Sequence, residues 1–407
     1  MDTKQILEHF TQTAYSRTGG SREEARCAAY LAACCAELGL DAKLEPFEVD
    51  MAEIQTAALI VDGREIPCKG YLCAGSGEVE APLYYLTGSD PYSLAQCRGK
   101  IVLVDGYMGY WKYHDLLDNG AVGFVTYDGN ANYADRDIDR RELRSYVSQG
   151  RKLPGVNINA NDAITLVKGG AARAKITLSQ EEYKGESQNV VAEIPGSRPK
   201  TIVFTAHYDS TFLSQGAYDN FSGCVGLLWL AEYFAAHPPV YSLRFVWCGS
   251  EERGLLGSKA YCAAHEAELD SIVLNINLDM IGCVMGGFIA CCTAEEKLCH
   301  YIEYLGAEQG FGIKVRQDVY SSDSTPFADR GIPAVSFARI APNNTATIHN
   351  SYDTLALIRP EQMAADCEFI TAFAARMACA KSMPVAREMP EAMKEKLDLY
   401  LCRKREK

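Results

Sequence analysis

Two of the seven histidines of this chain lie in polar turns with a carboxylate close by in the sequence. His207 precedes Asp209 by two residues, and His349 precedes Asp353 by four. A metal-bound imidazole commonly donates its second N–H group to such a carboxylate, which fixes the tautomer and the direction of the ring. Taken alone, either histidine is more simply a structural or surface residue. Both are nevertheless candidate metal ligands.

Four further carboxylates follow or precede apolar segments: Asp219, Glu251, Glu252 and Asp279. Each has a structural explanation, because Asp219 could cap a helix, the glutamate pair could favour a helix N-terminus, and Asp279 could be a turn residue. Each carboxylate could also take part in metal binding or catalysis. An aspartate with two oxygens can bridge two cations, and adjacent glutamates point in different directions, so that one binds metal while the other faces water. Their number favours a metal site, because buried charges must be paired or metal-bound.

Apolar segments must position these side chains. Thr201–Ala206 is a nearly continuous apolar run, typical of a strand buried on both faces, and it leads into the first histidine. Leu243–Cys248 and Ile272–Leu278 are two further buried strands that lead into the other carboxylates. Cys224–Ala236 is apolar enough for a helix packed on a sheet. Because open α/β sheets bind ligands at the carboxyl ends of their strands, the sequence predicts an α/β fold with its site there.

The remaining segments predict a larger framework around these strands. We expect helices at Glu23–Leu38, Thr293–Gln309 and Pro360–Ala380, and an edge strand at Ala42–Val49. A polar loop, Ala341–Ser351, carries the second histidine. The chain is therefore expected to form a mostly parallel mixed sheet flanked by helices.

Residues 50–183 differ in character from the rest, with many glycines and tyrosines and short apolar runs between turn residues. Because 407 residues exceed the usual size of one hydrophobic core, we interpret this stretch as a separate β-rich domain inserted into the main one.

Composition narrows the functional classes. The net charge of −13 disfavours nucleic acid or an anionic membrane as a partner, so no nucleic-acid or membrane binding is expected. The first residues lack the apolar core of a signal peptide, and no apolar run of about 18 residues occurs, which predicts a cytoplasmic protein. The 16 cysteines form no CxxC pair and lie largely in apolar elements, as reduced thiols do. The oligomeric state is not predicted.

The chain resembles the co-catalytic zinc aminopeptidases, a family that includes aminopeptidase Y and glutamate carboxypeptidase-like zinc peptidases. The resemblance rests on segments in the family's order: SQNVVAEIPG, AHYDS, GAYDNFSG, SEERGLLGS, NLDMIG, SSDSTPF with GIPAVSF, and IHNSYDT. It implies a zinc-exopeptidase core formed by residues 1–49 and 184–407. By the same resemblance, RGKIVLVDG and NGAVGFVTY suggest that residues 50–183 are the protease-associated domain that several members carry as an insertion.

The resemblance also implies a site for two zinc ions, with manganese or cobalt as alternatives. One ion would be held by His207 and Asp279, and the other by Glu252 and His349. Asp219 would bridge the two. The ligands are thus nitrogen and oxygen atoms without thiolate.

In the implied mechanism, Asp209 orients its neighbouring histidine and Glu251 is the general base. The expected activity is an aminopeptidase that removes N-terminal residues from peptides with a hydroxide that bridges the two metals. Phe221 stands where the family usually has a small residue, and we expect it to narrow the pocket. Asp323 and Ser324 are given no catalytic role, since many relatives have histidine at the second position.

Three alternatives remain open on the sequence. A carboxypeptidase of the same fold would need a cation for the substrate carboxylate, and Arg339 and Arg253 are candidates by position. A glutaminyl cyclase-like transferase would use one zinc, whereas this ligand set is complete for two. A non-catalytic, receptor-like peptide-binding protein would be expected to lack ligands, and none is missing.

Overall fold

The computed structural model describes residues 1–133 and 137–406. Contacts between residues group the chain into two compact units, Met1–Glu48 with Glu186–Lys407, and Val49–Gly185. The boundaries expected from the sequence lie within two residues of these. The chain passes from one unit to the other within strands β1 (Ala42–Val61) and β8 (Arg173–Ile194).

The larger unit is built on a mixed sheet. Its strands, in order across the sheet, are β13 (Ile313–Gln317), β12 (Gly287–Thr293), β14 (Ala334–Ile340), β11 (Ile272–Leu278), β9 (Arg198–His207), β10 (Tyr241–Cys248) and the end of β8. The four central strands β14, β11, β9 and β10 are mutually parallel, whereas β12 and β8 run antiparallel to their inner neighbours. The carboxyl ends of the four central strands therefore lie at one edge.

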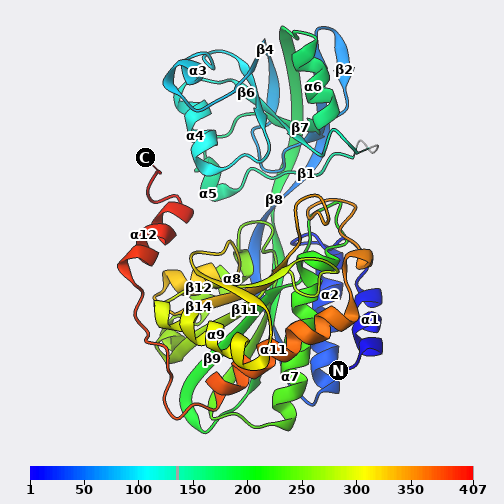
Figure 1. Cartoon of the computed structure of the whole chain (residues 1–407). Coiled ribbons are helices and arrows are strands. Elements are labelled where there is room, and N and C mark those ends of the chain that lie inside the picture. Colours follow the sequence, from blue (N-terminus) through cyan, green and yellow to red (C-terminus); the bar gives the residue numbers. More distant parts are fainter. Residues whose placement is uncertain (134–136, 407) are drawn as a thin grey trace. The chain divides into compact units, whose positions relative to one another are not determined.

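Helices cover both faces of this sheet, because alternate side chains of the strands are apolar on either side. In β9, Phe204 belongs to the larger hydrophobic cluster and Val203 to the smaller one on the opposite face. The helices that line the larger cluster are α1 (Thr3–Gln12), α2 (Arg22–Glu37), α7 (Ser222–Ala236), α9 (Glu296–Gln309) and α11 (Pro360–Ala378). Figure 1 shows α1 and α2 beside α7 and α11, although the chain positions of the two pairs lie far apart.

The opposite face carries shorter helices. They are α8 (Leu256–Ala264), the 3₁₀ turn Glu266–Ser271 and α10 (Ser324–Asp329), with α12 (Glu391–Tyr400) packed on α10. The predicted fold class, a mostly parallel mixed sheet flanked by helices, is confirmed.

One predicted boundary is wrong. The helix expected at Thr293–Gln309 begins only at Glu296, because Thr293 is the last residue of β12. Thr293 pairs with Ala334 of β14, and its hydroxyl donates to the carbonyl of Asp318. Two tertiary contacts thus outweigh the helical periodicity that follows. Strand β1 is also longer than the predicted Ala42–Val49, because its later residues pair within the second unit.

The second unit, Val49–Gly185, has its own sheet and two hydrophobic clusters. Its strands, in order from β8, are β4 (Gly77–Tyr85), β5 (Ile101–Asp105), β6 (Gly123–Asp128), β7 (Gly155–Asn159) and β3 (Lys69–Gly70), and β2 (Arg64–Ile66) pairs with β1. Four helices accompany them: α3 (Pro91–Ala95), α4 (Tyr110–Asp118), α5 (Ser145–Ser148) and α6 (Ala160–Lys168). Its assignment as a protease-associated domain stays a prediction.

Within residues 1–133 and 137–406, no helix is both long enough and apolar enough to span a lipid bilayer.

Candidate metal centre

The pairing register of the central strands places the ends of β9, β10 and β11 at the same height along the sheet. Cys248 of β10 pairs with His207 of β9, and Asn277 of β11 pairs with Thr205. Asp279, two residues beyond Asn277, is therefore level with His207. The sheet alone thus places the end of each strand within reach of the others.

The first cluster of candidate ligands is fully buried. The Nε2 atom of His207 lies 3.2 Å from Oδ1 of Asp219 and 3.9 Å from Oδ1 of Asp279. One ligand atom from each of these residues falls within 4.8 Å of the others, as a shared metal requires. Asp219 comes from the π-helical turn Ala217–Phe221, which directly precedes α7.

The second cluster uses the other oxygen of Asp219. The Nε2 atom of His349 lies 3.0 Å from Oδ2 of Asp219 and 3.1 Å from Oε2 of Glu252. These three residues again offer ligand atoms within 4.8 Å of one another. Because Asp219 turns one oxygen toward each cluster, its carboxylate has the geometry of a bridge between two cations.

The donor set and its spacing fit zinc. Ligand atoms at about 2.0–2.2 Å from a tetrahedral zinc ion lie roughly 3.3–3.6 Å from one another, close to the observed distances. Imidazole nitrogen and carboxylate oxygen are both ordinary zinc ligands. The centre also gathers more acidic groups than its two imidazoles can balance: Asp209, Asp219, Glu251, Glu252 and Asp279. Divalent cations would neutralise this excess, since unpaired buried charge is strongly unfavourable.

The electrostatics of the centre favour positive charge at the same atoms. Burial lowers the pKa of His207, but the charge of Glu251 and other nearby carboxylates raises it well above its ordinary value. Burial also lowers the pKa of His349. The charge of Glu252, followed by the contacts with Asp219 and Glu252, raises this pKa well above its ordinary value. Burial raises the pKa of Asp219, whereas hydrogen bonds with the two imidazoles hold it below the usual range. The imidazoles thus lie where a cation is stabilised.

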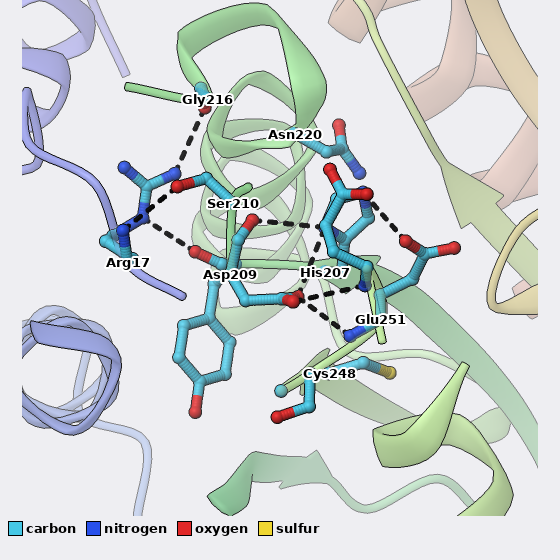
Figure 2. Close-up of polar contacts among 12 residues, drawn as sticks. Arg17, His207, Asp209, Ser210, Gly216, Asn220, Cys248 and Glu251 are labelled. Atoms are coloured by element: carbon cyan, nitrogen blue, oxygen red, sulfur yellow. Dashed lines mark hydrogen bonds and ion pairs between the residues drawn. The ribbon is translucent and has the colours of Figure 1, made fainter. Parts of the chain in front are cut away.

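Asp209 joins the end of β9 to the turn after β10. Its Oδ1 and Oδ2 atoms accept hydrogen bonds from the backbone N–H groups of Glu251, at 2.9 Å, and Glu252, at 3.1 Å. Oδ1 also lies 3.4 Å from Nδ1 of His207, on the ring nitrogen that faces away from the candidate metal position. Figure 2 shows dashed contacts that run from Asp209 toward the histidine and Glu251. The carboxylate can thus orient the imidazole and fix the glutamate pair at once.

Asp353 binds the backbone beside Asp219, whereas the sequence suggested that it would accept a hydrogen bond from His349. Its two oxygens accept the backbone N–H groups of Tyr218, at 2.8 Å, and Asp219, at 3.1 Å. It therefore holds the candidate bridging residue in place, instead of serving as the acceptor for His349 suggested by its position four residues later. Burial and the charge of Asp219 raise the pKa of Asp353 to about 7.

Arg17 supports the loop between His207 and Asp219, although no local sequence pattern marks it. The side chain is fully buried, and its guanidinium donates to the carbonyls of Tyr208, Gln215 and Gly216. Its backbone N–H donates to Oγ of Ser210, a contact drawn in Figure 2. One arginine from the start of the chain thus fixes most of this loop.

Glu24 of α2 was also missed, although the sequence holds a signal for it. Helix α2 buries Cys27, Ala28 and Leu31, which lie three, four and seven residues after Glu24. A carboxylate therefore occupies the apolar stripe of the helix, where a charge needs hydrogen-bonding partners. In the structure the side chain is fully buried and reaches Ser250, the residue before the glutamate pair.

Phe221 does not narrow a pocket, contrary to the expectation. Its ring is fully buried in the helical layer, 6.1 Å from the ring of Phe10, with the Arg17 guanidinium over its face. The prediction failed because the backbone kinks at Asp219 and Asn220, just before α7, and the ring of Phe221 packs in the core. Ser324 begins α10, and its hydroxyl forms hydrogen bonds with those of Ser322 and Ser336. Its side chain is thus engaged with other serines and belongs to neither cluster of candidate ligands.

The two arginines proposed for a carboxypeptidase are engaged with the protein. The guanidinium of Arg339 forms hydrogen bonds with both oxygens of buried Asp366 and with the carbonyl of Gly286. Arg253 contacts the carbonyl of Gly19. Neither arrangement presents a free guanidinium for a substrate carboxylate.

Comparison with known proteins relates the chain to peptidases. Residues 189–374 match the model of peptidase family M28. Aminopeptidase YwaD of Bacillus subtilis (strain 168) is 27% identical over 399 residues, which cover 90% of this chain and 82% of that protein. Leupeptin-inactivating enzyme 1 of Streptomyces exfoliatus is 33% identical over 184 residues, 42% of this chain and 41% of the enzyme.

Solved structures extend the likeness to the whole chain. BSAP, a zinc aminopeptidase from Bacillus subtilis, aligns with a TM-score of 0.78 and 25% identity over 95% of this chain and 97% of its own. The aminopeptidase from Aneurinibacillus sp. strain AM-1 has the same fold, with a TM-score of 0.76, 21% identity and coverage of 95% and 96%. Within the chain, the match to peptidase family M28 is confined to residues 189–374, the segment that holds all of the candidate ligands.

Proposed function

We propose that the protein is a two-zinc aminopeptidase that hydrolyses the N-terminal residue of peptides. The observation that carries this proposal is the carboxylate of Asp219, whose two oxygens each face a separate cluster of ligand atoms. Its relatives support the proposal, since they are named as aminopeptidases and as a zinc aminopeptidase. In our proposal the ligands are His207, Asp219, Glu252, Asp279 and His349.

When bound, two zinc ions would activate water and polarise the peptide carbonyl as Lewis acids. Glu251 is the proposed general base, because its Oε2 atom lies 3.9 Å from Nε2 of His207, at the edge of the first cluster. Burial raises the pKa of Glu251 well above its ordinary value, and the nearby carboxylates add to this while His207 opposes it. A carboxylate tuned in this way can take a proton from water and later give it to the departing amine.

Cleavage from the amino end is favoured over cleavage from the carboxyl end. A carboxypeptidase needs an exposed cation for the substrate carboxylate, and Arg339 is instead buried against Asp366. The acidic surroundings of the centre instead suit a protonated α-amino group. Peptides are accordingly the proposed partners, with no role for nucleic acid or a membrane, as the net charge of −13 suggests.

We also propose that residues 50–183 form a protease-associated domain, and that the protein works in the reducing environment of the cytoplasm. The second proposal is supported by the sixteen cysteines, none of which forms a disulfide in the described part of the chain.

Two neighbouring substitutions test the proposed roles. Glu251→Ala should lower kcat by about 10²–10⁴-fold, the usual contribution of general acid–base catalysis, and leave both zinc ions bound. Glu252→Ala should lower the zinc content, because it removes a ligand. Metal analysis and turnover of free and N-blocked peptides measure both effects, and Glu303→Ala, an exposed position on α9, is the control. Full activity in Glu251→Ala, or equal zinc content in both variants, contradicts the assignment.

A further inference from the structure

The turn between β10 and α8 presents three successive backbone N–H groups to two carboxylates. The N–H of Ser250 donates to Oε1 of Glu24 at 2.8 Å, and those of Glu251 and Glu252 donate to the two oxygens of Asp209. Asp209 belongs to the neighbouring strand end, whereas Glu24 comes from α2, more than two hundred residues earlier in the chain. The turn that carries the proposed base and a proposed ligand is thus held from two sides.

Glu24 is bound tightly on its own side. Its Oε1 atom also accepts from Oγ of Ser187 at 2.9 Å and lies 3.0 Å from Oγ of Ser250. Its Oε2 atom accepts the backbone N–H of Gly20 at 2.6 Å. Two of the hydrogen bonds of this buried carboxylate are with Ser250, one with its backbone N–H and one with its hydroxyl. This pattern stabilises one position of the serine relative to the helix.

The conformation of Ser250 explains why such a contact is needed. Its φ angle is +53°, in the left-handed region that residues with a Cβ atom rarely occupy. A conformation of this kind persists when its surroundings determine it. A Cβ atom on Gly249 would lie 3.0 Å from Oε1 of Glu24, and one on Gly19 would lie 2.4 Å from Oγ of Ser250, so the turn is packed closely against its support. The direction in which Glu251 leaves the turn follows from the φ and ψ angles of Ser250.

We propose that Glu24 is a positioning residue for the reaction, which aims Glu251 by holding Ser250 in its left-handed conformation. The inference rests on the proposed function for the role of Glu251. It assigns a role in turnover to a helix that supplies none of the proposed ligands. Asp209 fixes the two glutamates to the sheet, and Glu24 fixes the residue just before them to α2.

Three variants and one control test this on the full-length, zinc-loaded protein. Glu24→Ala removes the acceptor, and Glu24→Gln keeps one oxygen of the same reach. Gly19→Ala leaves Glu24 intact and pushes Oγ of Ser250 from outside the carboxylate network. Leu31→Ala is the matched control, because Leu31 is a buried residue of the same helix, seven positions after Glu24, and packs in the large hydrophobic cluster.

The measurements distinguish an effect on the orientation of Glu251 from an effect on the stability of the whole protein. We expect Glu24→Ala and Gly19→Ala to lower kcat by about 10–100-fold, since a displacement of about 1 Å at a catalytic group has effects of this size. KM should stay within twofold and the zinc content at two. Glu24→Gln should recover kcat to within about fivefold of wild type. Hydrogen exchange of the Ser250 amide should accelerate in Glu24→Ala, whereas Leu31→Ala should lower Tm without changing kcat or this exchange rate.

The opposing results are equally specific. Unchanged kcat in folded Gly19→Ala and Glu24→Ala, or slow exchange at Ser250 without the carboxylate, overturns the inference. Should Glu24→Ala not fold, Gly19→Ala and Glu24→Gln decide the outcome. An inactive wild-type protein with two zinc ions bound would instead contradict the proposed function, and the exchange measurement would still test the contact between Glu24 and Ser250.

Discussion

The two ligand clusters share Asp219 but differ in what holds their other members. His207 is the last residue of β9 and Asp279 directly follows the adjacent parallel strand β11, and their side chains are 2% and 7% exposed. His349 lies in the loop between β14 and the 3₁₀ turn Leu355–Leu357, its side chain is 39% exposed, and its φ angle is +60°. One cluster is therefore fixed by sheet register and the other depends on a surface loop. The metal of the first cluster should bind more tightly than that of the second.

The largest expected effect comes from removing the residue that the clusters share. Asp219→Ala should reduce the zinc content of both clusters and lower kcat/KM by on the order of 10³-fold or more, because metal ions supply several kcal/mol and each 1.4 kcal/mol is a factor of ten. Zinc analysis after dialysis and peptide turnover measure the two effects. A variant that keeps two zinc ions would show that Asp219 is not a bridge.

A smaller effect, confined to one cluster, is expected from the exposed histidine. His349→Ala should lower the zinc content from two to about one and leave the first cluster filled. His207→Ala should disturb both clusters, because its ring lies against Asp209, which also accepts the backbone N–H of Glu252. We expect wild-type protein treated with increasing chelator to lose its zinc in two steps. His300→Ala, an exposed histidine of α9, is the control. Loss of both ions in a single step, in the chelator series or in His349→Ala, would remove the distinction between the clusters.

The smallest effect concerns the support of the buried cluster. Arg17→Met should lower the free energy of unfolding by about 1–3 kcal/mol, since buried carbonyl groups lose their donor. The zinc content should stay at two at saturating metal. Denaturant unfolding measures the stability, and Arg26→Met, an exposed arginine of α2 that lies over the ring of Tyr15, should change it by less than about 0.5 kcal/mol. Equal stability of the two variants would mean that Arg17 does not secure the loop.

Much of the fold could be predicted from the sequence because its central elements have unambiguous patterns. The predicted strand Ile272–Leu278 has the bounds of β11, and the helix expected at Glu23–Leu38 differs from α2 by one residue at each end. The helix expected at Thr293–Gln309 was misplaced at its start, because strand pairing decided the state of Thr293. Local periodicity thus succeeded where burial is continuous and failed at a junction.

For the site, too, some residues could be predicted from local sequence and others could not. Each proposed ligand follows a strand or lies in a polar turn, so that residue type and position mark it as a candidate. Asp353, Arg17 and Glu24 act through backbone groups of other segments, and no local pattern reveals which N–H or carbonyl a side chain will reach. Phe221 was misjudged for the same reason, because its direction is set by the turn at Asp219.

The contacts of Arg17 and Glu24 also bear on where the working enzyme begins. Residues 189–374 carry every proposed ligand and the proposed base, yet both of these side chains come from the first 48 residues of the same unit. A recombinant fragment cut to residues 189–374 would keep the proposed metal ligands and lose the two side chains that hold the loop after β9 and the turn after β10. Adding residues 1–48 back as a separate peptide should then restore turnover that the fragment lacks.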